Sequence, residues 1–258
     1  DLALGDLVNN GTIPSTNPVA ELRGGEALDP EKSTSWTLGA VFTLGAVDIT
    51  VDYFNIEMED RIAPSQLYSL TQAEVDSLVA SGVTSAANLQ NFRFFTNDFD
   101  TTTKGIDIVA SYMTEAIGDS TVISLAYNNT QTEVDKYSPE TIDETRIREL
   151  QEGLPESRLS LSSNTDVGNW TFVGRVSSYD DWFDSEDGRV YGGEILVDAE
   201  VAYSFSESAT VMFGAQNLFD QYPEENPGGA DGAGNRYSQF SPFGFEGGYY
   251  YLRTRYAF

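Results

Sequence analysis

The chain of 258 residues contains no cysteine and no histidine. Without cysteine there can be no disulfide, no thiolate metal site and no cysteine nucleophile. Without histidine, the usual general base and the commonest ligand of zinc, copper and iron are missing. The enzyme chemistries that remain use paired carboxylates, a serine–lysine pair, Mg²⁺ or Ca²⁺. These absences argue against most classes of enzyme.

Basic residues are also scarce, because only 14 residues are Lys or Arg, 41 are Asp or Glu, and the net charge is −27. Binding of phosphate groups needs a basic face, so we expect no nucleic-acid partner. Hydrophobic residues nevertheless make up 40% of the chain and aromatic residues 12%. This content argues against disorder and requires that the aromatic side chains pack together or lie at a membrane interface.

Long hydrophobic runs are missing as well: no stretch of 18 apolar residues occurs, so no transmembrane helix is predicted. No signal peptide is visible, and we interpret the start at Asp1 as the result of cleavage or truncation. Instead, apolar and polar residues alternate with period two, which is typical of β-strands. The pattern predicts nine strands, over residues 33–44, 47–60, 104–115, 121–134, 156–166, 169–182, 194–205, 209–219 and 249–258.

The predicted strands are about 11 to 14 residues long, enough to cross a bilayer at a tilt. Tight turns alternate with long connections, a pattern typical of outer-membrane barrels with short periplasmic turns and long extracellular loops. Residues 1–32 are expected to belong to an extracellular loop. The other long loops are expected at about residues 61–103, 135–155, 183–193 and 220–247. In the first of these, Thr71 and Glu74 form a capping box that predicts a short helix.

The last strand ends on an aromatic residue with no polar tail. One face carries Tyr250, Leu252, Thr254, Tyr256 and Phe258, and the other carries Arg253 and Arg255. This arrangement suits a strand with one face in lipid and one in a wet lumen. It resembles the C-terminal recognition strand of outer-membrane barrels, so Tyr250, Leu252, Tyr256 and Phe258 are predicted to serve barrel assembly.

Nine is an odd number, whereas closed bacterial barrels normally have an even number of strands. A free strand edge cannot lie in lipid, because its backbone groups would have no hydrogen-bond partner. We therefore expect the chain to be the C-terminal portion of a larger barrel.

Five segments resemble, in order and spacing, motifs of TonB-dependent outer-membrane receptors. They are Leu28–Gly39, Val47–Ile62, Thr103–Ile108, Asn217–Pro223 and Tyr249–Phe258. The resemblance implies an all-β, antiparallel transmembrane β-barrel of 22 strands, of which these would be the last nine. It also implies a plug domain and a box for a TonB-type energy-transducing protein, both in an N-terminal region missing from these residues.

For function, the resemblance implies a receptor in the outer membrane of a Gram-negative bacterium. It would take up a scarce nutrient such as an iron–siderophore, cobalamin, a nickel complex or an oligosaccharide, with no enzymatic activity and no cofactor. Its further partners would be outer-membrane lipids and the barrel assembly machinery. The alternatives are a plugless porin-like channel, a small outer-membrane barrel enzyme, and a secreted soluble β-protein. The enzyme alternative is weakened by the absence of histidine.

The last loop is the candidate ligand-binding segment, because it gathers aromatic residues around an arginine. Side chains facing a vestibule could stack on or clamp a ligand, although the favoured interpretation is that they pack within the loop or belong to the outer aromatic girdle of the barrel. The candidates are Arg236, Tyr237, Phe240 and Phe243, with Tyr222 and Phe245 nearby.

A second candidate is an acidic cluster before the last hairpin, formed by Asp180, Asp181, Asp184, Glu186 and Asp187. Several oxygen ligands could hold Ca²⁺, but the spacing does not match an EF-hand loop, so a solvated loop is favoured and no metal is predicted. On the lumen face we expect charge ladders that join Arg175, Arg253 and Arg255 to Asp48, Asp52, Asp107, Asp198 and Glu200.

Overall fold

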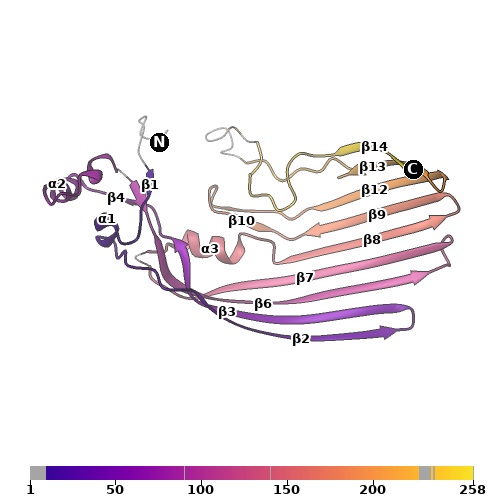
Figure 1. Cartoon of the computed structure of the whole chain (residues 1–258), viewed down its shortest axis with the longest axis horizontal. Helices are drawn as coiled ribbons and strands as arrows, with labels where there is room; N and C mark the ends of the chain where they lie inside the picture. Colours follow the sequence, from indigo (N-terminus) through magenta and orange to yellow (C-terminus); the bar gives the residue numbers. More distant parts are fainter. Residues whose placement is uncertain (1–9, 90, 140, 227–233, 235, 258) are drawn as a thin grey trace. The chain divides into compact units, whose positions relative to one another are not determined.

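A computed structural model describes residues 10–89, 91–139, 141–226, 234 and 236–257. Within these residues nine long strands form one sheet in the order β14-β13-β12-β9-β8-β7-β6-β3-β2 (Figure 1). Apart from the short elements in the loops, each strand therefore pairs with its neighbour in sequence. This confirms the predicted meander of hairpins and the all-β class. The nine strands are β2 (Lys32–Leu44), β3 (Val47–Pro64), β6 (Phe95–Thr114), β7 (Ser120–Tyr137), β8 (Ser157–Val167), β9 (Trp170–Tyr179), β12 (Ile195–Ser206), β13 (Ala209–Gln216) and β14 (Tyr249–Tyr256).

Tight turns connect the strands at one end of the sheet, which we call the turn end. Gly45, Gly118 and Gly168 adopt positive φ angles of 64°, 73° and 56° in three of these turns. Glycine reaches this left-handed region without the steric penalty that a Cβ atom brings. The long connections all leave from the opposite end of their strands, which we call the loop end.

Several strands extend further toward the loop end than the alternation predicted. The strand predicted to begin at Lys104 begins at Phe95, and the strand predicted to end at Asp60 continues to Pro64. The sequence of this extension is mostly polar, so its alternation was not recognised, although Phe99 and Thr101 are two residues apart and both buried. Phe99 packs with Ala63 and Ile142 in a buried cluster that sequence periodicity does not show.

The predicted strand 169–182 was too long, because β9 ends at Tyr179. Trp182 belongs instead to a separate hairpin of β10 (Trp182–Asp184) and β11 (Arg189–Tyr191). Asp180 ends the ladder by donating its backbone N–H to the Ser157 carbonyl at 3.1 Å.

The loops hold further short elements, and the helix predicted after Thr71 is confirmed. It is α2 (Gln72–Ala80), and both hydrogen bonds of its capping box are present. The other helix-like elements are α1 (Pro18–Glu21), η1 (Thr84–Asn88) and α3 (Glu144–Glu152). A small sheet contains β1 (Asn10–Thr12), β4 (Tyr68–Ser69) and β5 (Asn91–Arg93).

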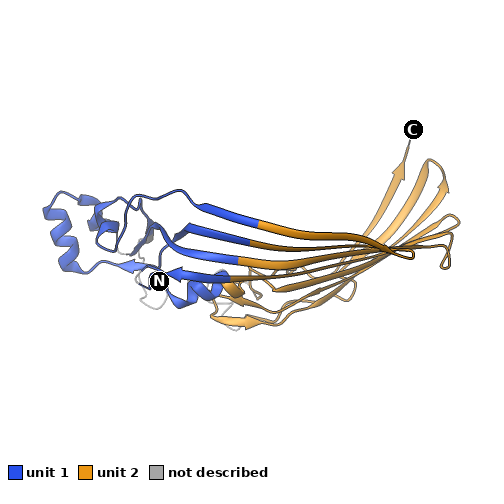
Figure 2. Cartoon of the chain, turned by 90° about the horizontal axis from the view of Figure 1, so that it is seen from below, with its two compact units in different colours: residues 1–35, 56–102, 133–150 blue, residues 36–55, 103–132, 151–258 orange. Residues whose placement is uncertain are grey.

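The chain divides into two compact units (Figure 2). The first comprises residues 1–35, 56–102 and 133–150, and the second residues 36–55, 103–132 and 151–258. The first unit contains a loop core in which α1, α2 and β5 bury Val19, Ala20, Leu78 and Phe92. In this unit Arg23 pairs with Glu74 at 2.8 Å. Hydrogen bonds from the backbone N–H of Thr71, from Arg23 and from the Thr71 hydroxyl lower the pKa of Glu74 to about 2.

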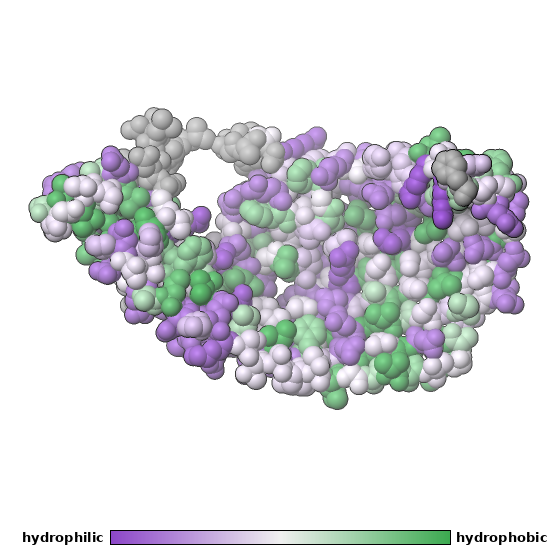
Figure 3. Space-filling view, viewed as in Figure 1, coloured by the Kyte–Doolittle hydropathy of each residue, from purple (hydrophilic) through white to green (hydrophobic). Residues whose placement is uncertain are grey.

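In the second unit the sheet has one apolar and one polar face. Leu125, Leu161, Val176 and Val197 lie side by side in one row of the register. On the other face Arg175 lies opposite Asp198. Large apolar side chains remain exposed on the strands, such as Leu38 at 72% and Leu252 at 71%. Figure 3 shows apolar and hydrophilic residues interspersed on one side of the molecule.

No helix among the described residues combines the length and the apolar character needed to span a membrane.

Candidate functional site

The β10–β11 hairpin and the last loop meet in the second unit and form a packed structure at the loop end. Asp184 is only 3% exposed and accepts hydrogen bonds from the Ser238 hydroxyl and from the backbone N–H of Glu186. Ser238 is itself 2% exposed. A buried carboxylate needs such donors, because burial without them is costly. Asp184 therefore organises the loop, instead of standing free as a ligand for a cation.

Two more members of the acidic cluster, Asp180 and Asp187, also accept hydrogen bonds from nearby side chains. Asp180 accepts a hydrogen bond from the Ser157 hydroxyl at 3.0 Å, and Asp187 accepts one from the Tyr191 hydroxyl. Burial and the bond to Asp187 raise the pKa of Tyr191 well above its usual range. Within the described part of the chain, no three His, Cys, Asp or Glu side chains are placed to hold a metal ion.

An ion pair and a hydrogen bond connect the β10–β11 hairpin to the last loop. Arg189 pairs with Glu224 and lies 4.5 Å from the centre of the Tyr191 ring. Tyr191 in turn stacks on Trp182, with ring centres 4.9 Å apart and an angle of 14° between the planes. Gln239 donates to Glu186 at 3.1 Å. The indole N–H of Trp182 is buried and has no hydrogen-bond partner among the described residues.

The four candidate ligand-binding residues of the last loop do not converge on one point. Tyr237 stacks on Tyr222 at 5.2 Å, whereas Phe243 packs on Tyr179 at 5.4 Å. Arg236 pairs with Glu225, and this bond raises the pKa of the Arg236 guanidinium. Phe240 is 50% exposed. Packing within the loop thus accounts for Tyr237 and packing on β9 accounts for Phe243, while Phe240 and the Arg236 side chain reach solvent.

The terminal strand β14 lies within the residues 249–258 for which the alternation predicted it. Tyr250, Leu252 and Tyr256 pair with Ala215, Phe213 and Ala209 of β13 on the apolar face. Phe258 lies outside the described residues. Among aromatic residues of the apolar face, Trp170 packs on Tyr203 with ring centres 4.6 Å apart.

On the polar face, Arg253 forms an ion pair with Glu200 at 3.2 Å, which confirms one predicted step of the charge ladder. Glu200 also accepts a hydrogen bond from the Tyr251 hydroxyl at 2.7 Å. Gly214 of β13 stands between Glu200 and Tyr251 in the register. A Cβ atom on Gly214 would lie 2.4 Å from the Tyr251 ring, so only glycine leaves room for it.

The alternation did not identify a cavity beside the β10–β11 hairpin. The last residue of α3, Glu152, and the connection to β8, with Leu154 and Glu156, contribute to its wall. The signal that could have found it is Leu154, an apolar residue between glycine and proline in an otherwise charged segment.

Comparison with known proteins identifies the fold. The family model for the β-barrel of TonB-dependent receptor-like proteins matches residues 3–218. Among curated proteins, none matches this sequence.

Solved structures of similar fold include the copper transporter OprC, which aligns with a TM-score of 0.60 and 14% identity over 95% of this chain and 34% of that chain. The FrpB iron transporter from Neisseria meningitidis aligns with a TM-score of 0.58 and 14% identity, over 88% of this chain and 31% of that one. The ferric citrate transporter FecA aligns with a TM-score of 0.57 and 19% identity, over 92% and 32%. The chain thus spans about a third of the length of these proteins.

At such identities the structures establish the fold alone, and the family rests on the sequence match over residues 3–218. Together with the nine-stranded meander and its two unlike faces, that match shows that this chain belongs to the TonB-dependent receptor-like β-barrel family.

Proposed function

We propose that the chain forms part of the barrel wall of an outer-membrane receptor that takes up a scarce nutrient with energy from a TonB-type protein. The observation that carries the proposal is the family match over residues 3–218. The solved structures of similar fold named as a copper transporter, an iron transporter and a ferric citrate transporter agree with uptake of this kind.

The two faces of the sheet give the proposal its orientation. The face with Leu161, Val176 and Leu252 contacts lipid, and the face with Arg175, Glu200 and Arg253 lines the lumen. A wet lumen tolerates these charges, whereas the hydrocarbon core does not. The loop end, including the connections at about 61–103, 135–155, 183–193 and 220–247, then faces the outside of the cell.

For the nutrient, we propose a small molecule such as an iron–siderophore or cobalamin, or an oligosaccharide. Phe240 and the Arg236 guanidinium are the exposed members of the last-loop set and contact the ligand, while Tyr237 and Phe243 support them from within the loop. Tyr250, Leu252, Tyr256 and Phe258 serve recognition by the barrel assembly machinery.

The experiment is uptake of labelled ligands by cells that express the whole receptor. Ferric siderophores, cobalamin and oligosaccharides are compared in cells with and without the TonB-type protein. Uptake that needs both the receptor and that protein supports the proposal. Uptake that continues without the energy-transducing protein identifies a passive porin-like channel instead.

A further inference from the structure

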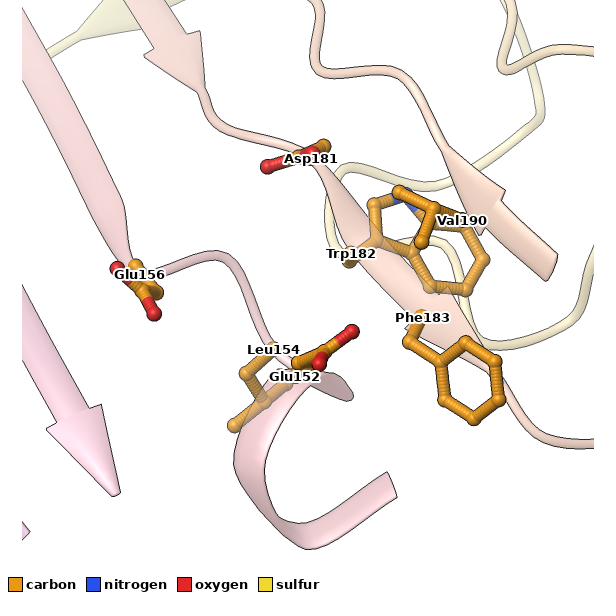
Figure 4. A pocket seen from close by; sticks show the side chains of 7 residues that line it. All are labelled: Glu152, Leu154, Glu156, Asp181, Trp182, Phe183 and Val190. Atoms are coloured by element: carbon orange, nitrogen blue, oxygen red, sulfur yellow. The ribbon is translucent and has the colours of Figure 1, made fainter. Parts of the chain in front are cut away.

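A cavity of about 320 Å³ lies between the α3–β8 connection and the β10–β11 hairpin. Figure 4 shows its seven lining side chains. The end of α3 contributes one of them, the connection to β8 two, and the hairpin region four. They are Glu152, Leu154, Glu156, Asp181, Trp182, Phe183 and Val190.

The lining combines two kinds of chemistry. Two of the carboxylates, Glu152 and Glu156, come from the segment between the end of α3 and β8, the third, Asp181, directly precedes β10, and no lining residue is basic. Phe183 and Val190 are opposite each other in the β10–β11 ladder, so they share one face of the hairpin. With Leu154 they give the cavity apolar surface beside its carboxylates.

Part of this apolar surface is exposed outside the long strands. Leu154 is 76% exposed and Val190 is 38% exposed. Neither residue belongs to a strand of the nine-stranded sheet, so contact with membrane lipid does not explain them. Apolar surface beside a cavity is the usual lining of a small-molecule site. A ligand with an apolar body would cover these two side chains.

Two of the three carboxylates have no basic partner among the described residues. The Asp181 carboxylate has no hydrogen-bond or ion-pair partner among the described residues. Glu156 accepts a hydrogen bond from the Gln131 side-chain amide at 3.1 Å, and this donor is neutral. Like charges that line a hollow attract a cation, and the attraction grows when water is displaced.

The geometry of the cavity favours an organic cation over a metal ion. A bound metal ion needs several oxygen ligands at 2.3–2.6 Å in the case of calcium. The carboxylates of this cavity do not form a group of three that could hold a metal ion, a statement that covers the described residues. Carboxylates spread around apolar walls instead suit a larger ion whose charge is attached to a hydrocarbon body.

We propose that this cavity binds an organic cation, namely a protonated amine on an apolar or aromatic body. The amine lies among Glu152, Glu156 and Asp181, and the body covers Leu154, Phe183 and Val190. The proposal rests on the proposed function for its location outside the cell, where the amine would be part of the nutrient that the receptor captures.

The test uses the whole receptor, purified in detergent, and 4-fluorophenethylamine as the probe, with binding followed by ¹⁹F NMR. The comparison compound is its N-acetyl derivative, which keeps the aromatic body and loses the charge. We expect the amine to bind about tenfold or more tightly than the amide, which corresponds to about 1.4 kcal/mol.

Three variants locate the binding. Neutralisation by Glu152→Gln, Glu156→Gln and Asp181→Asn together should weaken amine binding about tenfold and leave amide binding unchanged. The matched control, Glu26→Gln, Glu115→Gln and Glu207→Gln, removes the same charge from exposed positions that do not line the cavity. It should leave amine binding within about twofold of the unaltered receptor, because distant exposed charges are screened. Leu154→Ser should weaken both compounds.

Equal binding of amine and amide, or equal losses in the two charge variants, would overturn the proposal. Heat-dependent gel mobility of each variant shows that the barrel is folded, so a loss of binding is not mistaken for misfolding. The measurement needs no energised uptake. A receptor that failed the uptake experiment could therefore still bind the amine, and the two proposals fail separately.

Discussion

The hydroxyl of Tyr251 on β14 donates a hydrogen bond to Glu200 on β12, 2.7 Å away, although β13 lies between these two strands. The bond exists because Gly214 of β13 has no side chain at the crossing point. Arg253 reaches the same carboxylate at 3.2 Å. Three strands are thus joined on the polar face by side chains as well as by their backbone ladders.

The first prediction concerns this glycine. Gly214→Ala places a Cβ atom 2.4 Å from the Tyr251 ring, so the ring must move and its bond to Glu200 is lost. We expect a loss of about 1–3 kcal/mol, the usual effect of overpacking. The measurement is the temperature at which the band of the folded barrel on a gel shifts to the position of the unfolded chain. Gly174→Ala is the control, because a Cβ atom there meets nothing within 4 Å. The temperature of the gel shift should therefore not change in this variant.

A second prediction tests which face of the sheet meets lipid. Leu252 is 71% exposed on the apolar face, whereas Gln216 is exposed on the polar face near Asp198. Leu252→Lys should cost about 2–4 kcal/mol if the strand lies near the middle of the bilayer, and folded receptor in the outer membrane should decrease. Gln216→Lys should be assembled normally. Equal assembly of the two variants would contradict the assignment of the faces.

The third prediction concerns the capping box of α2. Thr71→Ala removes the side-chain acceptor for the backbone N–H of Glu74 and should cost about 1 kcal/mol in local stability. Hydrogen exchange of the α2 amides should become about fivefold faster, because 1.4 kcal/mol corresponds to a factor of ten. Ser77→Ala on the exposed side of the same helix is the control, and unchanged or slower exchange is expected there.

The fourth prediction is a dependence on pH. The pKa of Glu74 is lowered to about 2 from its usual value of 4.5, mainly by the backbone N–H of Thr71 and then by Arg23. A carboxyl group with a depressed pKa stabilises the folded state fully above its unfolded pKa and loses this effect as the pH falls through the folded value. Protection of α2 from exchange should therefore decline between about pH 4.5 and 2.

Glu74→Gln removes the titrating group, so this decline should disappear in the variant. Glu21→Gln, an exposed glutamate of α1, is the comparison and should retain it. A variant of Glu74 whose α2 protection still falls over the same pH range would show that another group is responsible.

Alternation along the strands was enough to predict the nine-stranded meander, because burying one face against lipid imposes a period of two. The capping box of Thr71 was predictable for a different reason, since all its partners lie within one turn. Phe95–Thr103 was not recognised as strand, because Phe99 packs against Ala63 and Ile142, which lie far from it in the sequence.

The candidate site was predicted less well. The sequence placed Tyr251 and Arg253 on the same face, but their common partner Glu200 depends on a register that no local pattern contains. Trp182 was read as the end of a strand, whereas its stack on Tyr191 makes it part of a separate hairpin. The cavity of Glu152, Leu154 and Asp181 joins segments whose polar sequences show no period. All three features depend on contacts between residues that local sequence patterns do not relate to one another.

The up-and-down order of the sheet also has an evolutionary consequence. Since β7 pairs with β8, β8 with β9 and β9 with β12, all antiparallel, the direction of β12 is opposite to that of β7. Deleting the segment that contains β8 and β9 would leave β7 and β12 antiparallel and able to pair. One hairpin is therefore the smallest piece that can be duplicated or lost without reversing any other strand. Such a wall can widen or narrow in steps of two strands, while each remaining loop stays on its own side.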